Sequence, residues 1–188
     1  MTAIVDYGAG NLTSVRNAFS VLGEDAVVTR AADVVRSADR VVFPGVGAAK
    51  SAMANLRELG LEGAVREAAA SGRPFLGICL GMQILFEHSE EDGGVDLLGI
   101  LPGKVRRFPD VPGFKVPEIG WNQVNGKTDY YFVHSYYAEK GPFTVGTTEY
   151  AGVEFTSAVR KGNLVAYQFH PEKSGKAGLA LLKEFLSC

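Results

Sequence analysis

Short apolar runs alternate with longer amphipathic segments through the first half of the chain. The apolar runs are rich in β-branched residues and lie at residues 3–5, 26–29, 40–43 and 75–78. The amphipathic segments repeat apolar residues every three to four positions and lie at residues 12–22, 48–59, 61–70 and 80–86. Strands that alternate with helices at this spacing are typical of βαβ units. We therefore expect a parallel sheet covered by helices.

The pattern changes near Glu90, where glycine, proline, β-branched and aromatic residues take over. Six β-rich runs follow, at residues 97–101, 104–108, 130–136, 144–149, 155–160 and 164–169. Residues 161–163, between the last two runs, are typical of a hairpin loop, and residues 175–186 have the pattern of a closing amphipathic helix. The sequence thus predicts an α/β fold, an open and mostly parallel sheet flanked by helices, with an antiparallel β extension. No repeat or low-complexity linker divides the chain, so we expect a single domain over residues 1–188.

The 188 residues carry a net charge of −2 and have a pI near 5.9, which argues against a general nucleic-acid or membrane-binding surface. A small basic cluster is interpreted as a solvated face or a protein contact; it comprises Lys104, Arg106, Arg107 and Lys115. The first residues, MTAIVD, reach a charge too early for a signal peptide, and no run approaches the ~20 apolar residues of a membrane span. We expect a cytoplasmic protein.

The strongest candidate for chemistry is Cys79, in the run PFLGICLGMQ over residues 74–83. An apolar, strand-like stretch ends at this cysteine, and a helical pattern follows at once. Glycines stand two positions before and two positions after it, as a sharp strand-to-helix turn with a strained central residue requires. A thiol at the start of a helix is favoured as the thiolate. This nucleophile elbow indicates acyl-transfer chemistry, whereas the alternative, a buried structural cysteine, leaves the two glycines unexplained.

A thiol nucleophile needs a base, and His170 is the best candidate. It ends a strand-like run, and Pro171 after it favours an extended backbone, so Glu172 can project from the same side and orient the imidazole. Active sites of open α/β sheets collect beyond the carboxyl ends of the strands, where Cys79 would also lie. Without Cys79, His170 would be interpreted as a turn residue.

The other two histidines are weaker candidates. His88 follows a helical stretch and is interpreted as a helix C-terminal residue, which the helix dipole favours. His134 lies in a strand-like run whose end could line a pocket, so we interpret it as part of a binding-site wall. The chain has two cysteines, Cys79 and the terminal Cys188, and neither a CxxC nor an HxxxH pattern accompanies them. We expect no disulfide, no metal and no cofactor.

A tetrahedral intermediate also needs N–H donors for its oxyanion. One donor would be the backbone N–H of Leu80, directly after the nucleophile, and the other should come from a glycine-rich loop after a neighbouring strand. The sequence PGVG, residues 44–47, follows a strand-like run and supplies such a loop. A Pro-Gly pair alone is an ordinary turn, so this interpretation depends on Cys79.

Three of these motifs together resemble those of the class I, triad-type glutamine amidotransferases, namely GICLGMQ (77–83), PGVG (44–47) and HPE (170–172). Further segments are similar, within that class, to the glutaminase subunits of imidazole glycerol phosphate synthase, of histidine biosynthesis. These are VDYGAGNL (5–12), the valine of PGVG, IGWN (119–122) and YFVHSY (131–136). The resemblance runs from residue 4 to about residue 174, in the family's order of motifs, and implies a flavodoxin-like fold.

The resemblance implies a role for each matching position. Cys79 would attack the side-chain carbonyl of glutamine to form a thioester, with His170 as general base and acid and Glu172 orienting it. Gly47 and Leu80 would donate N–H groups to the oxyanion, and the Val46–Gly47 peptide would act as a switch that turns when the partner binds its ligand. The other matches are the glutamine-binding positions Gln83, His134, Ser135 and Tyr136, and the partner-facing positions Asn11, Trp121 and Lys173.

The implied partner is a (β/α)8-barrel cyclase subunit, which forms a heterodimer with the glutaminase and receives ammonia through its interior. The implied overall reaction yields imidazole glycerol phosphate and AICAR. Nothing in the chain resembles a P-loop or a dinucleotide fingerprint, which agrees with an ammonia-acceptor site on another chain.

Two positions depart from the family pattern. Glu118 stands where a histidine is expected, and Ala49 stands where an aromatic residue is common. Neither belongs to the predicted triad, but Glu118 leaves the detail of its loop, and of partner docking, open.

Three other functions are compatible with parts of the pattern. The first is the glutaminase of another synthase, such as that of pyridoxal phosphate, against which the Asp6–Asn11 opening and the 120–122 motif weigh. The second is a catalytically silent binding subunit, which fits poorly with a complete triad. The third is a cysteine peptidase or general hydrolase, which would cleave amides other than glutamine.

Overall fold

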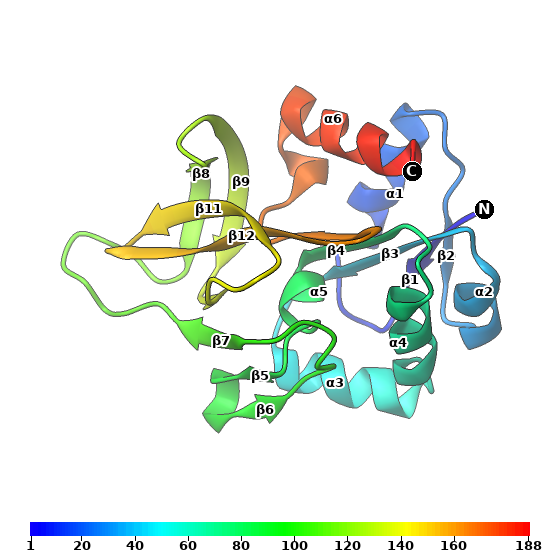
Figure 1. Cartoon of the computed structure of the whole chain (residues 1–188), viewed down its shortest axis with the longest axis horizontal. Coiled ribbons are helices and arrows are strands. Elements are labelled where there is room, and N and C mark those ends of the chain that lie inside the picture. Colours follow the sequence, from blue (N-terminus) through cyan, green and yellow to red (C-terminus); the bar gives the residue numbers. More distant parts are fainter.

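The computed structural model describes residues 1–188, and it alternates strand and helix as far as residue 83 (Figure 1). The strands are β1 (Thr2–Val5), β2 (Val27–Thr29), β3 (Arg40–Gly45), β4 (Phe75–Cys79), β5 (His88–Ser89), β6 (Val95–Asp96), β7 (Lys104–Arg107), β8 (Glu118–Val124), β9 (Thr128–His134), β10 (Tyr136–Ala138), β11 (Thr144–Tyr150), β12 (Val153–Lys161) and β13 (Leu164–Tyr167). The helices are α1 (Leu12–Val21), α2 (Ala32–Ser37), α3 (Ala49–Glu58), α4 (Glu62–Ala70), α5 (Leu80–Gln83) and α6 (Gly175–Leu186), with the 3₁₀ turns η1 (Glu91–Gly93) and η2 (Pro171–Lys173). None of the helices is long and apolar enough to cross a membrane.

Five neighbouring strands form the parallel half of the main sheet, in the order β2-β1-β3-β4-β13. The sheet continues through β12, β10, β7, β5 and β6, where antiparallel pairs predominate, and β11 pairs with β12. A separate two-stranded sheet consists of β8 and β9. The prediction of a mostly parallel sheet with an antiparallel extension is confirmed.

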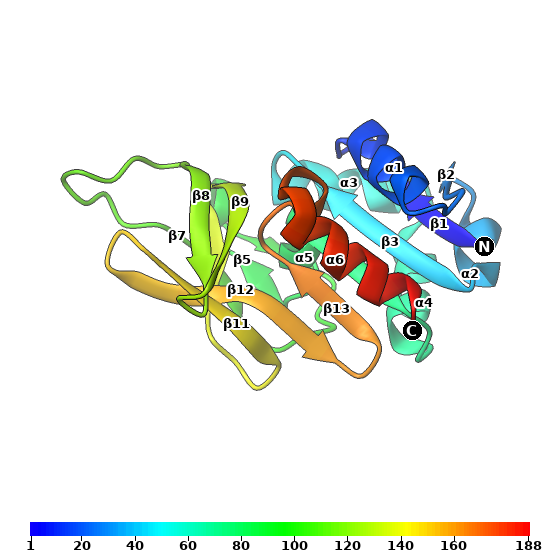
Figure 2. The same ribbon diagram turned by 90° about the horizontal axis from the view of Figure 1, so that it is seen from above.

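The parallel strands β1, β3, β4 and β13 are buried on both faces, and alternate side chains enter two separate hydrophobic cores. In β3, Val41 and Phe43 belong to the core that α2 to α5 cover, whereas Val42 belongs to the core that α1 and α6 cover. Figure 2 shows α1 and α6 together over one face of the sheet. Burial on both faces explains why these strands read as nearly continuous apolar runs rather than as alternating ones.

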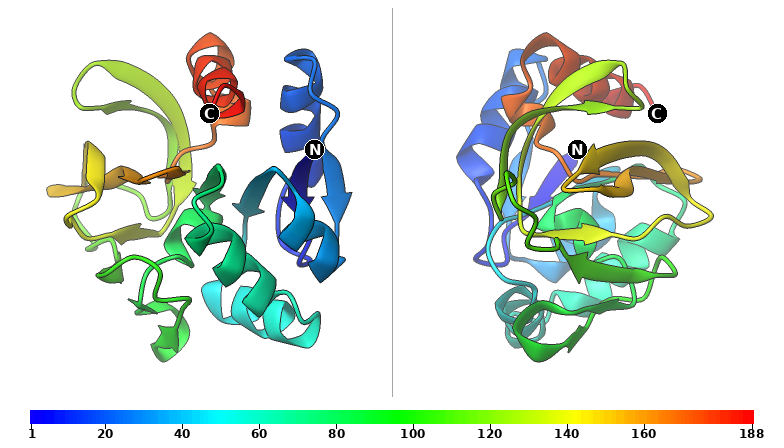
Figure 3. Two further views of the ribbon diagram at one scale, coloured as in Figure 1. Left: turned by 45° about the vertical axis from the view of Figure 1, so that its right-hand side comes forward. Right: turned by 90° about the vertical axis from the view of Figure 1, so that its left-hand side faces the viewer.

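The β8–β9 hairpin curves away from the parallel half of the sheet (Figure 3). Aromatic packing anchors its inner side, where Phe132 lies 6.2 Å from Phe155 and 5.6 Å from Phe169 between ring centroids. Its outer side carries Ile119 and Trp121, which are 64% and 59% exposed. The hairpin therefore joins the core on one side and presents apolar side chains to solvent on the other.

Two predicted elements near the middle of the chain are wrong in extent. The helix predicted over residues 80–86 ends at Gln83, and residues 97–101 form no strand. The reason is that the N–H groups of Leu98 and Ile100 donate to the carbonyls of Ile84 and Leu85, at 2.9 and 2.8 Å. In a longer helix those carbonyls would accept hydrogen bonds from the next turn. Because they accept from residues 98 and 100 instead, neither segment forms regular secondary structure.

Several elements were not predicted at all, among them the short strands β5 and β6, helix α2 and strand β8. Helix α2 has only six residues, too few for a clear amphipathic repeat. Strand β8 includes Gly120 and Asn122, which interrupt a β-rich pattern. Its stabilisation comes instead from pairing with β9, in continuous register from Glu118–His134 to Val124–Thr128.

Helix α6 presses directly on the turn η2. A Cβ atom at the buried Gly178 would lie 1.9 Å from the backbone oxygen of Pro171, so only glycine permits this approach. The turn carries Glu172 between Pro171 and Lys173. The contact thus fixes where Glu172 lies.

We expect Gly178→Ala to destabilise the protein by about 1–3 kcal/mol or more, because the added methyl group must push α6 and η2 apart. The matched control is Gly63→Ala in α4, where the nearest atom to a Cβ is 3.8 Å away and helix propensity should stabilise by ~0.5–1 kcal/mol. Denaturant unfolding of both variants measures the difference. Equal stabilities of the two variants would contradict this account of α6.

Candidate active site

Three adjacent strands deliver the predicted motifs to one edge of the sheet. Gly45 of β3 pairs in register with Cys79 of β4, and Ile78 of β4 pairs with Tyr167 of β13. The loop that contains Gly47, the elbow at Cys79 and the turn that contains His170 therefore follow neighbouring strand ends. This is the edge where active sites of open α/β sheets form.

Cys79 has φ 55° and ψ −114°, a conformation that residues with a side chain rarely adopt. The strand-to-helix turn around it is tight, because a Cβ at Gly81 would lie 1.9 Å from the carbonyl oxygen of Phe43. At Gly77 a Cβ would lie 2.9 Å from the Ala166 Cβ. The two glycines allow the elbow to pass between β3 and β13.

The thiol of Cys79 is 5% exposed and is held by weak contacts on two sides. Its Sγ donates to the carbonyl oxygen of Val133 at 3.7 Å, and the Gln168 Nε2 donates to Sγ at 3.8 Å. The resting thiol therefore points toward β9.

His170 and Glu172 form a close buried pair. The His170 Nδ1 lies 2.8 Å from Glu172 Oε1, so Nδ1 donates, and the two side chains are 3% and 1% exposed. The His170 backbone N–H donates to the carbonyl of Tyr131 at 2.9 Å, and the Ser174 hydroxyl donates to the His170 carbonyl at 2.6 Å. Two contacts thus hold the backbone of His170 and one holds its imidazole, while Nε2 stays without a hydrogen-bond partner.

Burial by itself lowers the pKa of His170, but the interactions with Cys79 and Glu172 outweigh it and raise that pKa to about 10. The carboxylate of Glu172 stabilises the imidazolium form, and Cys79 adds to this effect when it is deprotonated. The geometry therefore favours a charged His170 at neutral pH, with a proton on Nε2 available for a leaving group.

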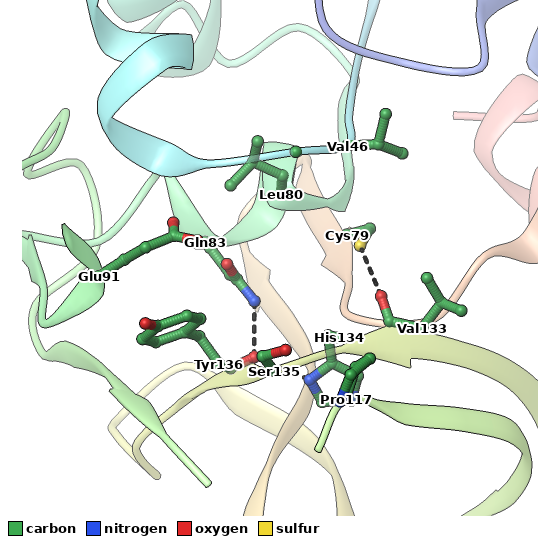
Figure 4. A pocket seen from close by; sticks show the side chains of 11 residues that line it. Val46, Cys79, Leu80, Gln83, Glu91, Pro117, Val133, His134, Ser135 and Tyr136 are labelled. Atoms are coloured by element: carbon green, nitrogen blue, oxygen red, sulfur yellow. Dashed lines mark hydrogen bonds between the residues drawn. The ribbon is translucent and has the colours of Figure 1, made fainter. Parts of the chain in front are cut away.

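Beside Cys79 lies a cavity of about 220 Å³ (Figure 4). Eight predicted site residues line it, namely Val46, Gly47, Cys79, Leu80, Gln83, His134, Ser135 and Tyr136, together with Glu91, Pro117 and Val133. His170 and Glu172 are not among the lining residues.

The loop at Gly47 is less tightly packed than the elbow at Cys79. Gly47 has φ +94°, a Cβ on it would meet no atom within 4 Å, and its N–H forms no hydrogen bond in the chain. Val46 before it is 39% exposed. Leu80, the first residue of α5, also has an N–H without an intrahelical partner. Both residues predicted to donate to the oxyanion therefore border the cavity.

Gln83 joins two walls of the cavity. Its Nε2 donates to the carbonyl of Tyr136 at 2.7 Å and to Gln168 Oε1 at 2.9 Å, while its Oε1 accepts no hydrogen bond (Figure 4). His134 Nδ1 also donates to the Tyr136 carbonyl at 2.7 Å. The interpretation of His134 as a wall residue agrees with its position in the cavity.

Sequence reasoning missed Glu91 and Gln168. Glu91 lines the cavity, and its Oε2 accepts from the Ala49 N–H at 2.6 Å, at the N-terminus of α3. Burial raises the pKa of Glu91. In the sequence Glu91 belongs to an acidic run that looks solvated, and Gln168 is an ordinary strand-end residue. No local signal distinguishes either.

The predicted partner-facing residues lie around the β8–β9 hairpin and η2. Trp121 packs edge-on against Tyr131 with ring centroids 6.1 Å apart, and the Lys173 Nζ lies 5.9 Å from the centroid of the same ring. Asn11 is exposed and caps α1 by accepting from the Ser14 N–H at 3.3 Å. Helix α1 contacts η2, so the three elements are neighbours.

The interpretation of His88 is wrong. It belongs to β5 rather than to a helix end, and its Nδ1 lies 2.9 Å from Asp96 Oδ1 on the surface. No group of three or more His, Cys, Asp or Glu side chains is arranged to hold a metal ion.

Comparison with known proteins adds to this geometry. Residues 3–187 match the family model described as glutamine amidotransferase class-I. Imidazole glycerol phosphate synthase subunit HisH of Moorella thermoacetica is 50% identical, over 97% of this chain and 92% of that protein. The subunit of the same name from Methanothermobacter thermautotrophicus is 49% identical, over 99% of this chain and 98% of that protein. The chain belongs to the HisH family of class I glutamine amidotransferases.

Solved structures agree on the fold of this HisH family member. A glutamine amidotransferase crystal structure matches with a TM-score of 0.77 at 23% identity, over 98% of this chain and 97% of that one. PurLQS from Thermotoga maritima matches with a TM-score of 0.73 at 17% identity, over 99% of this chain and 97% of that one. These likenesses concern the architecture alone.

The two departures from the HisH pattern are both buried. Ala49 is the fully buried first residue of α3, where its N–H meets Glu91. Glu118 is 3% exposed and faces His134, whereas its neighbour Ile119 faces solvent. Glu118 therefore lies behind the exposed face of the hairpin rather than on it.

We expect the pKa of His170, followed by ¹⁵N NMR of the ring, to lie well above its ordinary value of 6.5. Glu172→Gln should lower it, because the carboxylate charge is lost, and Cys79→Ala should lower it independently. Since the folded-state pKa is raised, this pair stabilises the fold fully below pH 6.5, and the stabilisation is lost as pH rises toward about 10. An imidazole that titrates near 6.5 in the wild type would contradict the charged pair.

Proposed function

We propose that this chain is the glutaminase subunit of an imidazole glycerol phosphate synthase, and that Cys79, His170 and Glu172 carry out the hydrolysis. The observation that carries the proposal is the buried His170–Glu172 pair at the strand end next to the Cys79 elbow, in a chain about half identical to HisH subunits over nearly its full length. The match over residues 3–187 supports treating the whole chain as one amidotransferase domain.

The first half-reaction forms a thioester. The Cys79 thiolate attacks the side-chain carbonyl carbon of glutamine, and the carbonyl oxygen takes the negative charge. The N–H groups of Gly47 and Leu80 stabilise that oxyanion. His170 then gives its Nε2 proton to the leaving nitrogen, the C–N bond breaks, and ammonia departs.

The second half-reaction reverses the proton movement. Neutral His170 accepts a proton from water, and the resulting hydroxide attacks the thioester carbon. The C–S bond breaks, which returns the thiolate and releases glutamate. Glu172 keeps Nδ1 protonated throughout, so that Nε2 alone exchanges protons.

Two acceptors in the cavity suit the α-ammonium group of glutamine. These are Gln83 Oε1, which accepts no hydrogen bond in the chain, and the Glu91 carboxylate. The wall formed by His134, Ser135 and Tyr136 lies opposite α5 and would contact the rest of the amino acid. A cavity of about 220 Å³ suits one small amino acid rather than a peptide.

The loop 44–47 is the proposed point of control. Gly47 sits in open space with an unbonded N–H, so its peptide with Val46 can rotate without breaking a hydrogen bond. A partner that binds its own ligand can thereby favour the orientation that completes the oxyanion hole.

We propose a (β/α)8-barrel cyclase as the partner and the cytoplasm as the place where the two meet. The exposed side chains Ile119, Trp121 and Val46 gather apolar surface near the cavity, as a protein-docking face requires. Asn11 and Lys173 would add polar contacts to it. The alternative synthases are less well supported, because the relatives above carry the name of imidazole glycerol phosphate synthase.

We expect Cys79→Ala to reduce glutamine-dependent synthesis by at least ~10³-fold while ammonia-dependent synthesis by the same complex continues. The physical reason is that the variant removes the nucleophile and leaves the acceptor site untouched. The measurement is product formation by the heterodimer with glutamine or with an ammonium salt. Loss of both activities in a folded complex would show that Cys79 has another role. Glutamine hydrolysis by the wild-type chain at a rate that does not change with the partner would contradict the assignment to this synthase.

Trp121→Ala should weaken binding of the cyclase about 10- to 100-fold, as truncation of a central interface aromatic does. The control is Phe114→Ala, another exposed aromatic, outside the hairpin, whose ring lies 5.2 Å from that of Tyr150. Titration calorimetry gives both affinities. An unchanged affinity for Trp121→Ala would place the interface elsewhere.

A further inference from the structure

A buried carboxylate lies behind the glutamine cavity without a place in the mechanism. Glu118 is the first residue of β8, is 3% exposed and pairs in register with His134 of β9. The Asn122 Nδ2 donates to Glu118 Oε1 at 2.7 Å, and Glu118 Oε2 lies 2.9 Å from His134 Nε2. A carboxylate out of water is costly unless such partners compensate for lost hydration.

His134 stands between two acceptors. Its Nδ1 lies 2.7 Å from the Tyr136 carbonyl oxygen, which can only accept, so Nδ1 must carry a proton. Its Nε2 faces the Glu118 oxygen, and two lone pairs there would repel each other. One proton must therefore lie between Nε2 and Oε2, on either atom. Glu118 thereby fixes the protonation and orientation of the ring, although the two groups are not aligned for a straight hydrogen bond.

The ring in turn holds the cavity wall. The Tyr136 carbonyl accepts from both His134 Nδ1 and Gln83 Nε2, each at 2.7 Å, and these two donors come from opposite sides of the cavity. Gln83 also donates to Gln168, which contacts the thiol of Cys79. The contacts form one chain from Glu118 to the nucleophile.

We propose that Glu118 is a positioning residue for glutamine binding: it orients His134 so that the His134–Tyr136 segment and Gln83 form a fixed wall. The proposal rests on the glutaminase function proposed above. Glu118 touches neither the cavity nor the triad, so it acts only through His134. Its effect should be on how well glutamine is held rather than on the chemical step.

Two substitutions separate this role from a general structural one. In Glu118→Gln the amide can still donate to His134 Nε2 and accept from Asn122, so the ring keeps its orientation. In Glu118→Met the volume is similar but both contacts are lost. The control is Glu67→Met, the same chemical change in an exposed pair with Arg36 at 2.8 Å, far along the chain on α4.

The experiment measures steady-state glutaminase kinetics in the complex with the cyclase and its ligand. We expect Glu118→Met to raise the KM for glutamine about tenfold or more and to change kcat less than about threefold. Glu118→Gln and Glu67→Met should stay within about threefold of the wild type in both constants. A KM unchanged by Glu118→Met, or a Glu118→Gln variant as impaired as Glu118→Met, would overturn the proposal.

A second measurement does not depend on activity. ¹⁵N and ¹³C NMR of the isolated chain should show a proton on either His134 Nε2 or the Glu118 carboxyl in the wild type, and an unprotonated Nε2 in Glu118→Gln. This result decides the matter if Glu118→Met does not fold. A wild-type chain in which Nε2 and the Glu118 carboxyl are both unprotonated would refute the role of Glu118. Absence of glutaminase activity in the wild-type complex, with the expected ring state, would instead refute the proposed function.

Discussion

The active site depends on how closely the start of α5 approaches the backbone of β3. With no side chain at Gly81, the first turn of the helix rests directly on the carbonyl of Phe43. In this arrangement Cys79 pairs with Gly45, the cysteine has a positive φ, and Leu80 lines the cavity. The positions of the proposed nucleophile and of one candidate oxyanion donor therefore follow from one backbone contact, whereas Gly47 and the proposed base come from other segments.

The proposed base, His170, follows β13 and is held in place by β9, which connects the interior of the site with the outer face of the hairpin. The Tyr131 carbonyl accepts from the His170 N–H, the Tyr131 N–H donates to Ser174, and the Val133 carbonyl accepts from Cys79. On the outside, Tyr131 pairs with Trp121 and lies under Lys173. A protein that binds to Trp121 and Lys173 therefore pushes on the same strand that holds the nucleophile and the base. In the proposed complex this strand would connect the docking face with the proposed catalytic residues.

The sequence predicts well whatever depends on local chemistry. The elbow, the PGVG loop and the HPE turn are short motifs whose residues act within a few positions of one another, and the strand order then brings them together. What the sequence does not reveal depends on distant partners. Glu91 looks solvated until Ala49 and the cavity surround it, Glu118 looks like a departure from pattern until His134 faces it, and α5 looks longer until residues 98–100 take its carbonyls. Strand β8 likewise exists because β9 pairs with it.

The two glycine-dependent turns of the site differ in what limits them. At Gly81 the obstacle is another backbone, so every side chain is excluded and no neighbouring substitution can make room. At Gly47 the surroundings are open and only the positive φ is restrictive, a condition that asparagine and aspartate also tolerate. Any substitution at Gly81 should therefore disturb the fold, whereas some substitutions at Gly47 should leave it intact. The proposed nucleophile turn is thus constrained by the packing of the whole fold, whereas the proposed switch is constrained only by its local backbone conformation.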